Sequence, residues 1–460
     1  MTDAPVWRGA RVAVFGLARS GVAASLFLHK RGARVVAIDR RTAADLGTIA
    51  TDLQAAGIEL SLGGHPDLSG FEAVVLSPGV DPTLAVIEDA RARGVRILPE
   101  LELGALAFPG RMVCITGTKG KSTTTASLAA MLREAGLDAR AVGNIGEPIT
   151  AHIDEARAET IFVTEVSSFQ LETTQDLRAH CAVFLNFFPD HLDRHPTLAS
   201  YAEAKARVFR NQTPQDLAVI NAEDATVVSL AARTRARILP FHPRNPLDAA
   251  TTPPGAGFVD GRAVLREAFD TTLFASDDVA IPGAAVRANL LAAAATAASL
   301  GADPRAIRQA VRAFRGVRHT FEKVGECRGV AFFNDSKATT LESVQVALES
   351  FDTPVIAILG GRLKAGSFRA LRDAVSRKVK AIHAIGESRG LVAGALGDLC
   401  PVHEALSLEE AVTLAHQEAV PGDTILLSPG CASFDMFRDY AARGDAFRRA
   451  FERLSMQGAA

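Results

Sequence analysis

The sequence lacks an excess of charge of one sign, an apolar run of membrane-spanning length and a set of paired cysteines. Its 460 residues contain 50 lysines and arginines against 52 aspartates and glutamates. No general basic field is therefore available to hold nucleic acid or an anionic membrane. The longest apolar stretch, 288–302, is shorter than the roughly 20 residues that span a bilayer.

The cysteines and the N-terminal residues point to the cytoplasm. The 5 cysteines are scattered and form no C-x-x-C pair, so neither a disulfide framework nor a thiolate zinc site is expected. The first residues lack the charged-then-apolar order of a signal peptide, because their apolar run is already a strand. We expect a cytoplasmic protein without nucleic-acid binding or membrane insertion.

Strand-length apolar runs alternate with helix-length segments along the whole chain, which predicts parallel sheets flanked by helices. The length is too great for one core and suggests about three domains. We predict an α/β protein with an N-terminal Rossmann-like domain, a central P-loop mononucleotide-binding domain and a C-terminal Rossmann-like domain. The predicted boundaries are 1–110, 111–316 and 317–460, with loops and short strands at 243–283.

The first glycine-rich turn, GLARSG at 16–21, lies between a predicted strand and a predicted helix. Asp39 ends the next strand, as the ribose-binding acid of a dinucleotide site would. Helix N-termini present free N–H groups to anions. Because the middle glycine is Ala18, the motif predicts phosphate or nucleotide binding only weakly, and a turn that merely packs a helix on a strand stays open.

The second glycine-rich turn, TGTKGKST at 116–123, is far more specific. It follows the apolar strand MVCI and begins the helix TTTASLAAML. Its backbone N–H groups are expected to surround the β- and γ-phosphates, Lys121 to neutralise them and Ser122 to ligate Mg²⁺. Ile115 occupies the first glycine position of the usual motif, so the spacing departs from the common pattern.

An acid, an imidazole and an amine follow in order: Glu165 at a strand end, His191 with Asp193 after another strand, and Lys205 on the next helix. Carboxylate oxygen suits Mg²⁺. Taken singly, Glu165 fits a solvated loop and Lys205 a surface lysine. Their position beside the phosphate loop favours a functional site.

The third block has the cluster NDSKAT at 334–339, with Lys364 and Ser433 following other strands. These residues could receive a ribose, phosphates or a carboxylate. The residues alone indicate an ATP- and Mg²⁺-dependent transfer to a small anionic substrate, with kinase, ATPase and ligase all open.

The motifs GLARSG, ITGTKGKSTTT, GNIG, EVSSFQLETT, PDHLDRH, YAEAK, NDSKAT and LLSPGCASFDMF together resemble the Mur ligases over nearly the whole chain. SSFQLETT and SPGCASFD are most similar to the glutamate-adding member. The resemblance implies three domains that bind a UDP-sugar, ATP and an amino acid in chain order. It implies ATP-dependent addition of D-glutamate to UDP-N-acetylmuramoyl-L-alanine, in two steps through an acyl phosphate, by what we expect to be a monomer.

The resemblance also assigns residues to ligands. The UDP-sugar contacts would be Arg19, Ser20, Asp39, Arg40, Ser77 and Asn144. The ATP contacts would be Gly117, Thr118, Lys119, Gly120, Lys121, Ser122, Thr123, Thr124, Asn289 and Asp335. The D-glutamate contacts would be Lys337, Thr339, Lys364, Ser433 and Tyr440. The catalytic set would be Lys121, Glu165, His191 and Lys205, with Ser122 and Glu165 serving one Mg²⁺, and His191 with carbamylated Lys205 a second.

Several positions depart from the family pattern. Lys119 replaces an asparagine beside the phosphates, Ala285 and Val286 replace a His-Asn pair, Thr320 replaces an arginine and Thr340 an asparagine. All but Thr340 concern the nucleotide, so altered ATP affinity or selectivity is expected.

Three alternatives remain at this point. One is a family member that adds L-glutamate or another amino acid. A nicotinamide-dependent dehydrogenase would explain GLARSG and Asp39 but leaves GTKGKST without a task. A non-catalytic phosphate-binding scaffold would leave Glu165, His191 and Lys205 unexplained.

Overall fold

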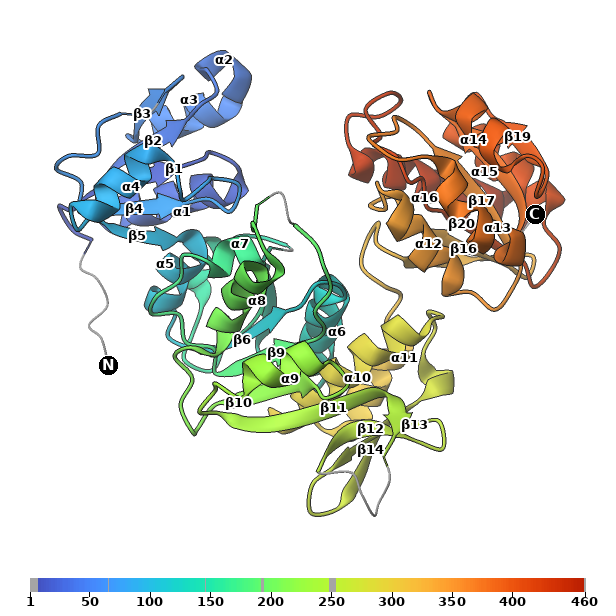
Figure 1. The fold of residues 1–460 in the computed structure, drawn as a ribbon, viewed down its shortest axis with the longest axis horizontal. Coiled ribbons are helices and arrows are strands. Elements are labelled where there is room, and N and C mark those ends of the chain that lie inside the picture. Colours follow the sequence, from blue (N-terminus) through green and yellow to red (C-terminus); the bar gives the residue numbers. More distant parts are fainter. Residues whose placement is uncertain (1–6, 65, 145, 192–193, 248–253, 459–460) are drawn as a thin grey trace. The chain divides into compact units, whose positions relative to one another are not determined.

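The computed structural model describes residues 7–64, 66–144, 146–191, 194–247 and 254–458. The chain divides into two compact units (Figure 1). The first consists of Met1–Ala275 with Ala288–Ala310, and the second of Ser276–Arg287 with Val311–Ala460. The first unit contains two sheets and the second contains one.

The N-terminal sheet has five strands in the order β3-β2-β1-β4-β5, all parallel. This order and the helices between the strands confirm the predicted Rossmann-like topology. The strands are β1 (Arg11–Phe15), β2 (Arg34–Asp39), β3 (Glu59–Leu62), β4 (Ala73–Leu76) and β5 (Arg96–Pro99). The helices are α1 (Arg19–Lys30), α2 (Ala43–Leu46), α3 (Thr48–Ala55), α4 (Ala85–Ala92) and α5 (Glu100–Ala107).

The central sheet has nine strands in the order β14-β13-β12-β11-β10-β9-β6-β8-β7, parallel from β7 through β12 and antiparallel beyond. The strands are β6 (Arg111–Thr116), β7 (Ala139–Gly143), β8 (Ile161–Glu165), β9 (Cys181–Phe184), β10 (Leu217–Asn221), β11 (Arg237–Pro246), β12 (Gly255–Val259), β13 (Arg262–Arg266) and β14 (Asp270–Ala275). The helices are α6 (Lys121–Glu134), α7 (Ser168–Leu171), α8 (Leu198–Ala206), α9 (Ala225–Ala231), α10 (Ala284–Ser299) and α11 (Pro304–Ala313). The 3₁₀ turns are η1 (Ile149–Ala151), η2 (Ile153–Glu155), η3 (Arg207–Phe209) and η4 (Ser276–Asp278).

The C-terminal sheet has six strands in the order β15-β16-β20-β17-β18-β19, and all neighbours are parallel except β15 with β16. The strands are β15 (Glu322–Cys327), β16 (Val330–Asn334), β17 (Val355–Gly360), β18 (Val379–Ile385), β19 (Val402–Glu404) and β20 (Thr424–Leu427). The helices are α12 (Leu341–Glu349), α13 (Arg372–Lys378), α14 (Arg389–Leu396), α15 (Leu408–Glu418) and α16 (Tyr440–Gly458), with a 3₁₀ turn η5 (Phe368–Leu371).

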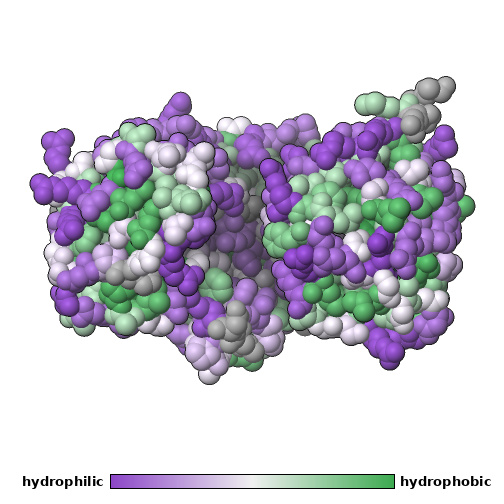
Figure 2. Space-filling model, turned by 90° about the horizontal axis from the view of Figure 1, so that it is seen from above, coloured by the Kyte–Doolittle hydropathy of each residue, from purple (hydrophilic) through white to green (hydrophobic). Residues whose placement is uncertain are grey.

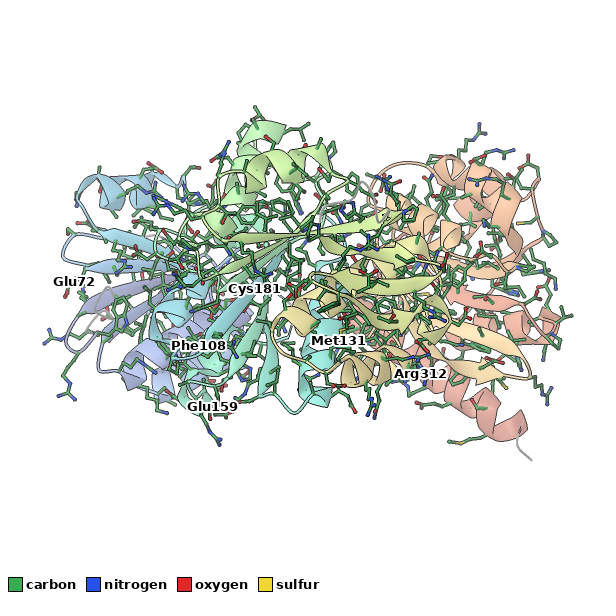
Figure 3. All side chains as sticks on the ribbon, turned by 90° about the horizontal axis from the view of Figure 1, so that it is seen from below. Glu72, Phe108, Met131, Glu159, Cys181 and Arg312 are labelled. Carbon is green, nitrogen blue, oxygen red and sulfur yellow. The ribbon has the colours of Figure 1, made fainter. Side chains whose placement is uncertain are left out.

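The apolar residues of the central strands are buried in each sheet, as the strand-length apolar runs in the sequence predict. On β9 and α6, Cys181 and Met131 are fully buried in the first unit (Figure 3). Phe108 stacks on Phe162 of β8, with 3.8 Å between the ring centroids. The face seen in Figure 2 carries hydrophilic residues interspersed with hydrophobic ones. Among the described helices, none combines the length and the hydrophobicity needed to cross a membrane.

Candidate active site

A cavity of about 870 Å³ lies at the carboxyl ends of β1, β2 and β4. Open parallel sheets bind ligands at this edge because the strands end there and helices begin. The cavity brings together every residue that the sequence assigned to the UDP-sugar. These residues are Arg19, Ser20, Asp39, Arg40, Ser77 and Asn144.

Gly16 and Gly21, in the glycine-rich turn that lines this cavity, occupy positions that leave no room for a side chain. Gly16 has a φ of 84°, and the Ser77 hydroxyl donates to its carbonyl oxygen at 2.7 Å. A Cβ atom on Gly21 would lie 1.8 Å from that same oxygen. Gly21 therefore allows α1 to pack closely on the turn, which is the packing role expected of such a glycine.

Asp39 is hydrogen-bonded to the protein on both carboxylate oxygens. Oδ2 accepts from the Leu17 N–H at 2.7 Å and from Arg41 Nη2 at 2.9 Å, and Oδ1 accepts from Arg41 Nε at 3.1 Å. Burial would raise the pKa of Asp39, but the hydrogen bonds from Arg41 and Leu17 outweigh it and hold the pKa well below its usual value. Arg41 also lines the cavity, and the sequence analysis missed it because a second arginine after Asp39 carries no distinguishing pattern.

The phosphate-loop turn joins β6 to α6 with its lysine folded back on the loop. Lys121 Nζ donates to the carbonyl oxygens of Gly117 and Thr118, both at 3.0 Å. Gly120 is left-handed, with a φ of 87°, and a Cβ atom there would lie 2.2 Å from Asn289 Oδ1. Asn289 of α10 is thus packed against the loop to which the sequence assigned it.

Asn186, which follows β9, holds the loop in shape. Its Oδ1 accepts from the backbone N–H groups of Thr118 and Lys119 at 3.1 and 2.9 Å, and its Nδ2 donates to the Lys119 carbonyl at 3.0 Å. The sequence analysis missed this residue. The available signal was one polar side chain at the end of an apolar strand, five residues before the predicted site residue His191.

Ser122, Glu165 and Asn144 form a connected group at the start of α6. The Ser122 hydroxyl donates to Glu165 Oε2 at 2.7 Å, and Asn144 Nδ2 donates to Glu165 Oε1 at 2.6 Å. Glu165 is buried, with 2% of its surface exposed. Hydroxyl and carboxylate oxygens are the ligands that Mg²⁺ prefers, and Asn144 links them to the cavity at the ends of β1, β2 and β4, which it also lines.

Lys205 is not a surface lysine, so the simpler interpretation of its sequence position is wrong. Its side chain is 1% exposed, its Nζ donates to the Gly117 carbonyl at 2.8 Å, and it lies 4.7 Å from the centre of the Tyr201 ring. Burial and then the charge of Lys121 lower the pKa of Lys205 to about 6, against the opposing influence of Asp190 and Glu165. A buried amine of this kind is largely neutral near pH 7.

His191 also lies near Tyr201, with 6.1 Å between the ring centroids, and near Phe169, with 5.0 Å between the centroids. Its φ of 54° is left-handed. Asp193, which the sequence grouped with it, is outside the described residues. Within the described part of the chain, no three His, Cys, Asp or Glu side chains form a metal-binding cluster, so the second metal set of His191 and Lys205 stays a prediction.

Lys119 is 70% exposed at its side chain and pairs with Asp190 at 3.5 Å. Burial raises the pKa of Asp190, but the charges of Lys119 and His191 outweigh it and leave the pKa below its usual value. The extra positive charge is therefore at the loop, where the sequence placed it, with an acidic partner that the sequence analysis did not identify.

In the second unit, the residues predicted to meet the amino acid differ widely in exposure. Ser433 is 3% exposed, Thr339 is half-buried, and Lys337 and Lys364 are exposed. Tyr440 is 41% exposed and approaches His319, with 6.4 Å between the rings. The two lysines are accessible to an anionic ligand.

Asp335 is buried at the end of β16, and its oxygens accept from the Phe321 N–H at 3.0 Å and the Ser428 hydroxyl at 3.1 Å. Burial raises its pKa to about 7. Nearby, Lys337 N–H donates to the His319 carbonyl at 3.0 Å, and the Thr320 hydroxyl is buried without a hydrogen-bond partner. The departure at Thr320 therefore places a buried hydroxyl group without a hydrogen-bond partner at this position.

Three family models cover most of the chain. The Mur ligase MurD-like N-terminal domain matches residues 10–99, the Mur ligase middle domain 115–297, and the Mur ligase glutamate ligase domain 318–431. Together with the three sheets and the phosphate loop, these matches define a three-domain ligase. The chain belongs to the Mur ligase family.

Individual relatives make the likeness more specific. A UDP-N-acetylmuramoylalanine–D-glutamate ligase from Solibacter usitatus is 40% identical, with 96% of this chain and 97% of the relative covered. The ligase of the same name from Pelotomaculum thermopropionicum is 40% identical over 95% and 96% of the two chains. Among solved structures, the UDP-N-acetylmuramate-alanine ligase of Thermotoga maritima is 17% identical with a TM-score of 0.59, covering 96% and 99%, which supports the fold alone.

Proposed function

We propose that the protein is an ATP-dependent ligase that joins D-glutamate to UDP-N-acetylmuramoyl-L-alanine in the synthesis of peptidoglycan precursors. The observation that carries this proposal is 40% identity across 96% of the chain with a ligase named for this reaction. The phosphate loop and the Ser122–Glu165 contact support the proposal, because the reaction requires groups that bind a triphosphate and Mg²⁺. We place the reaction in the cytoplasm, where ATP is available, and a monomeric state stays a prediction.

The proposed reaction has two steps. An oxygen of the alanyl carboxylate attacks the γ-phosphorus of ATP, and ADP leaves to give an acyl phosphate. The amine nitrogen of D-glutamate then attacks the acyl carbon, phosphate leaves, the amine loses a proton and an amide bond forms. The obstacle in the first step is repulsion between an anionic nucleophile and an anionic phosphate chain, so catalysis depends on positive charge and positioning.

Lys121 is the residue we assign to the phosphates. Its ammonium donates to two carbonyl oxygens of the loop, and a triphosphate would offer it stronger, charge-assisted partners. Mg²⁺, when bound, supplies further charge stabilisation at the phosphates, and Ser122 and Glu165 are the residues that would hold it. Carbamylation of Lys205 would convert a buried neutral amine into an anionic oxygen donor, which His191 would complement.

The roles in the second unit rest on the family resemblance and on accessibility. Lys337 and Lys364 are exposed and would answer the two carboxylates of D-glutamate, with Thr339, Ser433 and Tyr440 placing it. Asp335 would hold the ATP ribose. Its raised pKa means that it can donate as well as accept a hydrogen bond near neutral pH.

The test is phosphate release from ATP with UDP-N-acetylmuramoyl-L-alanine and each of D-Glu, L-Glu, D-Asp and L-Lys. We expect release that requires both the UDP-sugar and D-Glu, and a loss of at least about 100-fold in Lys121→Ala. Lys30→Ala is the matched control, because Lys30 is an exposed lysine paired with Asp154 away from the loop. Release with L-Glu or L-Lys but not D-Glu would reassign the amino acid, and release without any amino acid would contradict a ligase.

A further inference from the structure

A second cavity, of about 480 Å³, lies in the first unit, apart from the UDP-sugar and phosphate-loop residues. One wall comes from the N-terminal domain around α4 and the other from the central domain around α7 and η3. The side chains that matter are Thr83, Glu88 and Arg91 on the first wall, and Glu172, Arg207 and Arg210 on the second.

Each of the two acids that line this cavity already pairs with an arginine other than Arg207 and Arg210. Glu88 pairs with Arg91, and Glu172 pairs with Arg194 at 2.6 Å. Among the described residues, neither Arg207 nor Arg210 forms an ion pair with a carboxylate. Arg207 instead donates one N–H to the Thr174 carbonyl at 2.6 Å, so its guanidinium has no carboxylate in direct contact.

The positive charges of Arg207 and Arg210 lie close enough to disfavour each other. Burial and then the charge of Arg210 lower the pKa of Arg207, whereas Glu203, Glu102 and Glu172 act in the opposite direction. The end of a helix favours cations, which accounts for one arginine after α8 and η3. It does not account for two guanidinium groups lining a cavity.

We propose that this cavity binds a small oxyanion, a phosphate or carboxylate group, held by Arg207 and Arg210. Guanidinium groups offer paired N–H donors in the geometry of such anions. Thr173 adds a hydroxyl to the same cavity. Because Thr83 and Arg91 line the cavity from the N-terminal domain, the bound anion lies at the junction of the N-terminal and central domains.

Two measurements on the full-length protein test the site, both with UDP and ADP at saturating concentration so that the other phosphate sites are filled. The first is calorimetric titration with inorganic phosphate, with malonate as a carboxylate competitor. The second is a crystal soaked in tungstate, whose anomalous signal locates the ion. We expect a tungstate peak between Arg207 and Arg210 and a phosphate affinity that falls at least about tenfold in Arg210→Gln.

Arg237→Gln is the matched control, because Arg237 is an exposed arginine of the same domain paired with Glu267; it should bind phosphate as the unmodified protein does. Displacement of phosphate by malonate supports the site and extends it to dicarboxylates, and failure of displacement restricts it to phosphates. A peak without binding in solution means an adventitious ion only and overturns the proposal. Equal affinity in Arg210→Gln, or no peak, overturns it as well.

Discussion

The burial of Lys205 makes a quantitative prediction about its chemistry. A lysine with a pKa of about 6 is about nine-tenths neutral at pH 7, whereas at the ordinary 10.5 about one molecule in 3,000 is neutral. Carbon dioxide reacts with the neutral amine alone. The buried site therefore favours carbamate formation by roughly three orders of magnitude over an exposed lysine at the same pH.

We expect Lys205→Ala to lose at least about 100-fold in activity, because an anionic oxygen donor beside the phosphate loop disappears. Acetate or formate should restore part of the rate by filling the vacated space. Lys378→Ala is the control, since Lys378 is a half-buried lysine that, like Lys205, donates to a backbone carbonyl, in this case that of Phe351. It should retain its activity.

The direct assay is ¹³C NMR of the unmodified protein in ¹³C-bicarbonate. A carbamate signal should appear at about pH 8, weaken below about pH 6 as the amine is protonated, and be absent in Lys205→Ala. Removing carbon dioxide at mildly acidic pH should lower the activity of the unmodified enzyme. A fully active Lys205→Ala refutes the reasoning, and so does an unmodified protein that gives no carbamate signal.

Three further outcomes follow from the site. Asn186→Ala should raise the KM for ATP about tenfold with a smaller change in kcat, because both backbone N–H groups that Asn186 binds belong to the phosphate loop. Equal KM values in the variant and the unmodified protein would show that these hydrogen bonds do not support ATP binding. Lys119→Asn should raise the KM for ATP and the KM for GTP by similar factors, because a positive charge beside the phosphates serves both nucleotides equally; a change in the ratio of their kcat/KM values would show that Lys119 also influences base selectivity. Asp335→Asn should raise the free energy of urea unfolding at about pH 8 and change it little at about pH 4. The folded-state pKa of about 7 exceeds the usual value, so ionisation of Asp335 costs stability as the pH rises through this range.

The sequence was most informative where a backbone conformation dictates residue type. Gly16, Gly21 and Gly120 occupy positions where close packing or a left-handed φ excludes a side chain, so their spacing alone located the two turns. The parallel strands and intervening helices of the N-terminal domain likewise followed from apolar runs that alternate with helix-length segments. These features depend on the types and spacing of residues that are close in the sequence, so they can be predicted from it.

The partners of site residues could not be read in the same way. Asn186 and Asp190 act through contacts with residues brought near by the fold, 67 positions apart for Asn186 and Lys119. Nothing in the local sequence of Lys205 indicates that it is fully buried, because burial depends on how α8 packs on the phosphate loop. The pKa of such a group is therefore a property of the tertiary structure.

The hydrogen bonds of Asp39 bear on which compounds would inhibit this protein. In dinucleotide-binding domains the acid at this position meets a ribose diol, but here Oδ2 already accepts from Leu17 and Arg41, and Oδ1 accepts from Arg41. A compound that offers hydroxyl donors to Asp39 must first break those contacts, and it would release the turn that shapes the cavity. Inhibitor chemistry at this edge should instead present acceptor or anionic groups to Arg40 and Arg41, and libraries built on nicotinamide nucleotides are a poor starting point.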